Sequence, residues 1–68
     1  MESTQRPKKL SRLPAVLARV PFSRSQLYAE MEAGRFPRPI KISDRINAWD
    51  DDEIDTWISA RIAEREAA

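Results

Sequence analysis

Four consecutive polar side chains are the residues of this chain best suited to recognition by hydrogen bonding: Ser23, Arg24, Ser25 and Gln26. A guanidinium can form two parallel hydrogen bonds with the edge of guanine, and a primary amide can do the same with adenine. Serine hydroxyls and the free N–H groups of a helix N-terminus can bind phosphate. The stretch is therefore suited to contacting bases and phosphates from one end of a helix.

The composition argues against covalent catalysis and metal binding. The chain has no Cys and no His, so disulfides, zinc fingers and catalysis by a thiol or an imidazole are excluded. The acidic run 50–53 is better explained as helix capping, because successive positions at a helix start do not converge on one point. With one Gly and no phosphate-cradling loop, we predict no enzyme, no cofactor and no metal site.

Membrane association is not expected either. The apolar runs are a few residues long, far short of the roughly 20 that cross a bilayer. The first residues, Met1-Glu2-Ser3, are polar and lack the apolar core of a signal peptide. We predict a soluble cytoplasmic protein with neither a membrane partner nor a small-molecule substrate.

The 68 residues make one small domain, and its charge is strongly divided along the chain. Residues 1–45 hold ten basic and four acidic side chains, a net of +6, whereas residues 46–68 hold two basic and seven acidic ones, a net of −5. A basic part of this kind suits a phosphate backbone, and the acidic end would face away from it. The acidic helix of one copy could also dock on the basic part of a neighbour, giving head-to-tail self-association on DNA.

Helical signals dominate the first half of the expected domain, residues 10–66, which follows a flexible basic tail over residues 1–9. Apolar residues recur at helical spacing from Leu10 to Val20, with Pro14 in the first turn, which predicts a helix ending near Arg19. A second helix over residues 23–33 would be capped by Ser23 and ended by a left-handed Gly34.

The second half predicts a β-hairpin and a closing helix. Residues 40–43 alternate apolar and polar, residues 44–45 form a tight turn, and residues 46–49 return as the second strand of a wing. A third helix opens with Asp50 as N-cap and Glu53 three residues on. The fold class predicted is mainly α with a small β-hairpin, a winged helix-turn-helix. The expected core is Leu13, Val16, Leu17, Leu27, Met31, Phe36, Ile40, Ile42, Trp49, Ile54, Trp57 and Ile58.

The combination of Ser23-Arg24-Ser25 with Leu27-Tyr28, of Gly34-Arg35-Phe36-Pro37, and of the paired Trp49 and Trp57 resembles the AlpA family of phage-type regulators. The likeness covers roughly residues 10–65. It implies a compact DNA-binding protein of prophages and genomic islands, related in fold to excisionases and to the DNA-binding domains of the MerR group. It also implies action on the transcription of an integrase gene or on excision.

Each candidate contact has a structural alternative. Arg24, Ser25 and Gln26 would read bases, or else cover a solvated helix surface. Ser23 would cap the helix and bind phosphate, and Tyr28 would either donate to a phosphate or pack in the core. Arg35 and Arg38 would touch the DNA backbone, or else not contact DNA at all. The wing residues Lys41, Ser43 and Arg45 would bind phosphate or the minor groove, or would protect an edge strand from aggregation. Lys8, Lys9 and Arg12 form a basic patch in or beside the tail.

Three functions are open at this point. The first is a sequence-specific transcriptional regulator that places helix 23–33 in the major groove of double-stranded DNA and the wing over 40–49 on the flanking backbone or minor groove. The second is an excisionase-like factor that uses the same surface to bend DNA. The third is a small protein-interaction module whose acidic helix binds a partner and whose basic face only keeps the protein soluble.

Overall fold

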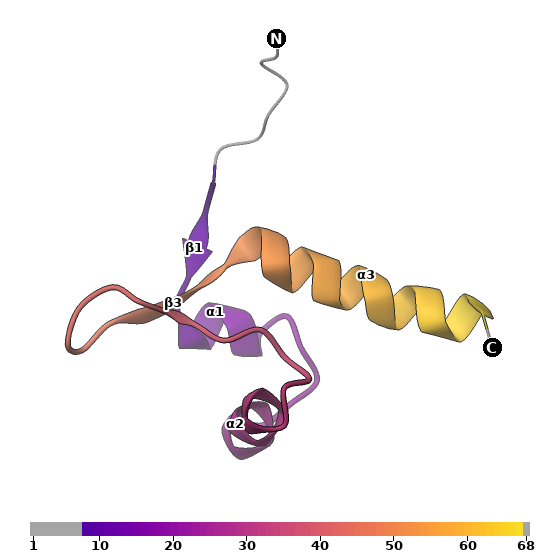
Figure 1. The fold of residues 1–68 in the computed structure, drawn as a ribbon, viewed down its shortest axis with the longest axis horizontal. Helices are drawn as coiled ribbons and strands as arrows, with labels where there is room; N and C mark the ends of the chain where they lie inside the picture. The colour runs from indigo at the N-terminus through magenta and orange to yellow at the C-terminus, as the bar shows by residue number, and fades with distance from the viewer. Residues whose placement is uncertain (1–7, 68) are drawn as a thin grey trace, which may run out of the picture.

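A computed structural model describes residues 8–67, and it contains three helices and three short strands within that range. Figure 1 labels the three helices, β1 and β3, and its colours give their order along the chain. Along the chain they are β1 (Leu10–Ser11), α1 (Leu13–Leu17), α2 (Arg24–Glu32), β2 (Ile40–Lys41), β3 (Asn47–Asp50) and α3 (Asp51–Ala67). The predicted fold class, mainly helical with a small antiparallel hairpin, is confirmed, and the arrangement is compatible with a winged helix-turn-helix.

The hairpin formed by β2 and β3 is the predicted wing, and β1 extends it to a three-stranded sheet of order β1-β3-β2. Both pairings are antiparallel, with Ile40 opposite Ala48 on one side and Ser11 opposite Trp49 on the other. Counting Leu10 in the helical spacing of the apolar residues was therefore wrong. Because Pro is accommodated only in the first turn of a helix, a helix containing Pro14 starts at Leu13 and leaves the preceding residues free to pair with β3.

The first helix needs a second correction, at its end, whereas most of the expected tail is not described. Residues 1–7 lie outside the described part of the chain. Of residues 8 and 9, the carbonyl of Lys9 accepts a hydrogen bond from the backbone N–H of Asp51 at 3.0 Å. At the other end of α1, the helix stops at Leu17, two residues before the predicted limit at Arg19.

Local signals define α2 at both ends, as predicted. The Ser23 hydroxyl accepts a hydrogen bond from the Gln26 backbone N–H at 3.2 Å. At the C-terminus, Gly34 has a φ of 78°, and its N–H donates to the carbonyl of Met31. The N–H of Arg35 reaches back to the carbonyl of Glu30 at 2.9 Å. These two bonds form a Schellman motif, which turns the chain sharply after one short helix.

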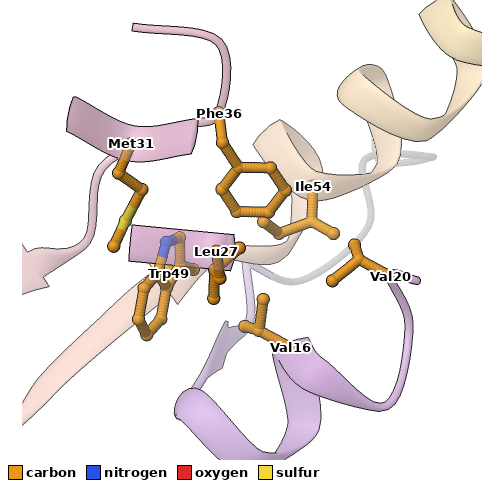
Figure 2. Close-up of a cluster of buried hydrophobic side chains, with 7 residues drawn as sticks. All are labelled: Val16, Val20, Leu27, Met31, Phe36, Trp49 and Ile54. Atoms are coloured by element: carbon orange, nitrogen blue, oxygen red, sulfur yellow. The ribbon is translucent and has the colours of Figure 1, made fainter. Parts of the chain in front are cut away.

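The core lies where α1, α2, β3 and the first turns of α3 meet (Figure 2). Its buried side chains are Val16, Val20, Leu27, Met31, Phe36, Trp49 and Ile54. Partly buried residues surround them, including Trp57 and Ile58, as predicted. Ile40 and Ile42 were wrongly assigned to the core, since they are 46% and 49% exposed. They lie on the hairpin, whose turn extends beyond the helices (Figure 1), although Ala48, opposite Ile40, is buried.

Helix α3 follows β3 without an intervening loop. The Asp50 carboxylate accepts a hydrogen bond from the Asp52 backbone N–H at 2.9 Å, which confirms Asp50 as the capping residue. Only the first half of α3 packs on the core: Ile54 is fully buried, whereas every residue from Ser59 to Ala67 is exposed. The second half extends away from the other elements (Figure 1).

Candidate nucleic-acid interface

The N-terminal turn of α2 presents a polar surface to solvent. Ser23, Arg24, Ser25 and Gln26 are all exposed, whereas Leu27 and Met31 are buried on the opposite side of the helix. The capping hydroxyl of Ser23 fixes the start of the helix. The core therefore holds this turn by its apolar side and leaves all four predicted contact residues accessible together.

A groove with a volume of about 340 Å³ lies between α1, α2 and the wing. Three guanidinium-bearing residues from three different elements line it: Arg12 before α1, Arg24 at the start of α2, and Arg45 at the tip of the wing. Tyr28 and Asn47 line it as well. Because like charges gather there without an acidic neighbour in the lining, the groove favours an anionic ligand.

Ion pairing separates the basic residues into two groups. Lys8, Arg19, Arg35, Arg61 and Arg65 each form an ion pair with a carboxylate. Within residues 8–67, by contrast, no carboxylate pairs with any of the following: Lys9, Arg12, Arg24, Arg38, Lys41 and Arg45. The unpaired group includes all three arginines of the groove. Its positive charge is therefore not neutralised inside the described structure.

The wing adds Lys41 to the side of the sheet that faces the groove. Lys41 is paired with Asn47 in the strand register, and side chains of directly opposed residues lie on the same face of a sheet. Asn47 and Trp49 both line the groove, so Lys41 shares their face. Ser43 is exposed at the turn, where its hydroxyl accepts a hydrogen bond from the Arg45 backbone N–H at 3.4 Å.

Tyr28 and Arg38 lie beside this surface. Tyr28 is 45% exposed, so its ring is not part of the buried core. Both residues line a neighbouring hollow of about 320 Å³ together with Glu32. They therefore extend the polar surface along α2 toward the segment that connects it to the wing.

Glu30 holds two of the predicted contact residues. Its carboxylate accepts a hydrogen bond from the Gln26 amide at 2.8 Å and one from Nε of Arg35 at 2.8 Å. The Arg35 hydrogen bond lowers the pKa of Glu30, and the same carboxylate raises the pKa of Arg35. Arg35 is thereby neutralised, unlike Arg24. The i, i+4 spacing of Gln26 and Glu30 could have indicated half of this network from the sequence.

Sequence reasoning placed Arg12 in a basic patch with Lys8 and Lys9, and the structure separates them. The Lys8 ammonium binds the carboxylates of Asp50 and Asp52 at 3.2 and 2.9 Å. Arg12 instead lies at the N-terminus of α1 and lines the groove, as does Asn47, which was not among the candidates. The strand register that carries Asn47 there could not be read from spacing alone.

Three helices with a small antiparallel sheet, an exposed polar turn on the second helix and a basic groove beside the hairpin are compatible with a winged helix-turn-helix domain. A family model described as "Prophage CP4-57 regulatory protein (AlpA)" matches residues 9–62. The chain belongs to this AlpA family of phage regulatory proteins. No curated protein and no solved structure gave a significant match. Across residues 8–67, no helix is both long and apolar enough to span a membrane.

Proposed function

We propose that this phage-type regulator binds double-stranded DNA sequence-specifically, with the N-terminal turn of α2 in the major groove and the wing on the flanking backbone or minor groove. The observation that carries the proposal is the convergence of Arg12, Arg24 and Arg45 on one groove beside the exposed start of α2, none of them paired with a carboxylate within residues 8–67. Phosphates supply the negative charge that this surface lacks.

Base contacts come from the exposed turn of α2. Arg24 is suited to guanine, and Gln26 to adenine once its amide leaves Glu30, while Ser25 is short enough to approach either base. The helix start that Ser23 caps contributes its free backbone N–H groups to a phosphate. The remaining phosphate contacts come from Tyr28, Arg38, Lys41, Ser43 and Arg45, and from Arg35 once it is released from Glu30. The DNA-binding unit comprises residues 10–66.

Helix α3 is placed on the side of the protein that faces away from DNA. Its first turn carries Asp51, Asp52 and Glu53, which would be repelled by phosphates. Lys8 neutralises part of this acidic end by binding Asp50 and Asp52. Apart from Arg35, the paired cations therefore stabilise the fold, and the unpaired ones bind DNA.

The family supports a proposal for the biological setting. We place the protein in the bacterial cytoplasm, acting at an integrase promoter of a prophage or genomic island. The excisionase-like alternative uses the same surface but bends the DNA to direct an integrase. A gel-mobility assay with the bound site at the centre or at the end of the fragment separates the two, because only bending makes mobility depend on position.

Fluorescence anisotropy tests the proposal directly. The wild type, Arg24→Ala and Arg65→Ala are titrated onto duplexes that tile the protein's own promoter and the nearest integrase promoter, with a scrambled duplex as reference. Both variants remove one Arg, but Arg65 lies on the exposed end of α3 and pairs with Glu66. We expect one fragment to bind far more tightly than the scrambled duplex, and only Arg24→Ala to abolish that preference.

Two results would contradict sequence-specific DNA binding by α2. Equal, weak and salt-sensitive binding of every duplex would show a nonspecific basic surface. It would favour the protein-interaction module, for which Arg24→Ala leaves the main activity unchanged. Equal losses from Arg24→Ala and Arg65→Ala would also contradict reading by α2, since these residues lie on different elements.

A further inference from the structure

Asn47 lies at the groove between α2 and the wing with a side chain that the fold does not use. It is the first residue of β3, is exposed, and lines the groove. Within residues 8–67 its amide forms no hydrogen bond. Asn is depleted in strands, because its side chain competes with the backbone for hydrogen bonds and packs poorly on a pleated surface. A residue that breaks a local rule without a structural gain is a candidate for a functional contact.

The backbone around Asn47 is held firmly. Asn47 is opposite Lys41 in the strand register, so β2 pairs with it directly. Trp49 is two residues further along the same face, and its buried indole donates a hydrogen bond to the carbonyl of Pro37. A short side chain on such a strand loses less conformational entropy on binding than the long side chains of Lys and Arg. Asn47 is therefore suited to a contact of fixed geometry.

The polar side chains that line the groove with Asn47 can all donate hydrogen bonds. Arg12, Arg24 and Arg45 carry guanidinium groups, which only donate, and no carboxylate lines the groove. None of these three arginines forms an ion pair within residues 8–67. The hydroxyl of Tyr28 and the amide of Asn47 can donate as well. Such a set of donors fits a negatively charged group with several acceptor oxygens, and a phosphodiester is one.

The proposed docking indicates which phosphodiester reaches this groove. Each sugar–phosphate strand of a duplex separates a major groove from a minor groove. With the start of α2 in the major groove and the wing over the flanking minor groove, one strand passes between α2 and the wing. The groove has a volume of about 340 Å³ and is lined by residues of both elements. It therefore lies on the path of that strand.

We propose that Asn47 and Arg12 bind one phosphate of the strand that passes between α2 and the wing, Asn47 through its amide N–H and Arg12 through its guanidinium. Arg12 lies between β1 and α1, so the contact joins the first part of the chain to the wing. Because phosphates are the same at every base pair, the two residues add affinity and fix the position of the protein without reading sequence. This contact rests on the proposed function, to which it adds Asn47 and a defined phosphate.

Anisotropy with the preferred and the scrambled duplex gives the first test. Asn47→Val removes the amide but keeps a side chain that favours strands, so the melting temperature should stay the same or rise. We expect its affinity to fall several-fold on both duplexes, with the ratio between them unchanged. Arg12→Ala should also weaken both, and should reduce the slope of log affinity against log salt concentration by about 0.9 in magnitude. Asn47→Val should keep the wild-type slope, because Asn carries no charge.

A methylphosphonate scan of the preferred duplex then locates the phosphate, because this group replaces one charged oxygen by a neutral methyl. Asn47→Asp puts a carboxylate in place of the amide, and its repulsion from the phosphate should lower the affinity roughly tenfold. One methylphosphonate position should restore most of that loss, and the same position should weaken binding of the wild type. Ser59→Asp is the matched control, since it makes the same change in charge on the exposed half of α3 and should behave as the wild type at every position.

The results separate this contact from the proposed function. If the wild type prefers one duplex but Asn47→Val binds it equally tightly, or if no methylphosphonate position restores binding by Asn47→Asp, the contact is overturned. A changed ratio between the two duplexes in Asn47→Val would make Asn47 a base reader and would also overturn the assignment to phosphate. If the wild type prefers no duplex at all, the proposed function itself fails.

Discussion

The indole N–H of Trp57 donates a hydrogen bond to the backbone carbonyl of Arg35 at 2.7 Å, which ties α3 to the segment that leaves α2. Trp49, on β3, does the same to the carbonyl of Pro37 at 3.0 Å. The segment between α2 and the wing contains two prolines, which have no N–H to donate. Its position therefore depends on its carbonyls, and the two indoles set the orientation of α2 relative to the wing.

Trp49→Phe should lower the free energy of unfolding by about 2 kcal/mol. Trp49 is only 2% exposed, so the change leaves both a cavity and a carbonyl that has lost its donor. Trp57→Phe should cost less, about 1 kcal/mol, because water can reach the carbonyl of Arg35 near a partly exposed ring. Urea unfolding followed by circular dichroism measures both. Equal losses would show that burial does not distinguish the two indoles.

The parts of the fold that sequence predicted well are those with local causes. Ser23 and Gly34 define α2 because a cap and a left-handed residue act within one helical turn. Asp50 starts α3 for the same reason. The strand β1 was missed because Leu10 pairs with Asp50, 40 residues further along the chain, and nothing near Leu10 indicates that partner.

In the candidate site, too, sequence predicted the features with local causes and missed those that depend on contacts between distant residues. The exposure of Arg24, Ser25 and Gln26 followed from the helical spacing of Leu27 and Met31. Arg12 and Asn47 reach the groove only through the packing of α1 and the register of the wing, which spacing does not encode. Likewise, alternation predicted which face Ile40 and Ile42 share, but not that their side chains remain about half exposed.

Gly34→Ala tests the backbone at the end of α2. A Cβ at this position would meet nothing within 4 Å, so the cost comes only from the φ of 78°. We expect a loss of about 1 kcal/mol in the free energy of unfolding. Gly34→Asn should cost less, because Asn tolerates the left-handed region better. Urea unfolding of both variants checks this. A smaller loss for Ala than for Asn would show that backbone conformation is not the cause.

The Lys8 and Asp50 pair predicts a dependence of stability on pH. The backbone N–H of Asp52, and then Lys8, hold the pKa of Asp50 below its ordinary value of 3.8. A depressed pKa stabilises the fold above the ordinary value, and that stabilisation is lost as pH falls through the folded pKa. The carboxylates of Asp52 and Asp50 raise the pKa of Lys8 above 10.5, so its contribution is lost at high pH instead.

Asp50→Asn isolates the acidic limb of this dependence. The amide oxygen of Asn can still accept the hydrogen bond from the Asp52 N–H, but the titrating charge is gone. We expect the drop in melting temperature between about pH 7 and about pH 3 to become smaller than in the wild type. Asp44→Asn serves as the control, because Asp44 forms no ion pair within residues 8–67, and should leave the drop unchanged. An unaltered drop in Asp50→Asn would contradict the assignment.

Ser23 allows stability and DNA binding to be separated at one residue. Its hydroxyl caps α2, so Ser23→Ala should lower the free energy of unfolding by about 1 kcal/mol. Ser23→Asp should keep that stability, since a carboxylate caps as well and favours the positive end of the helix. The added negative charge should nevertheless weaken DNA binding, because it meets a phosphate. Unfolding and anisotropy are measured on the same preparations. If Ser23→Asp bound DNA as tightly as the wild type, the start of α2 would not face the DNA backbone, and the proposed docking would have to be abandoned.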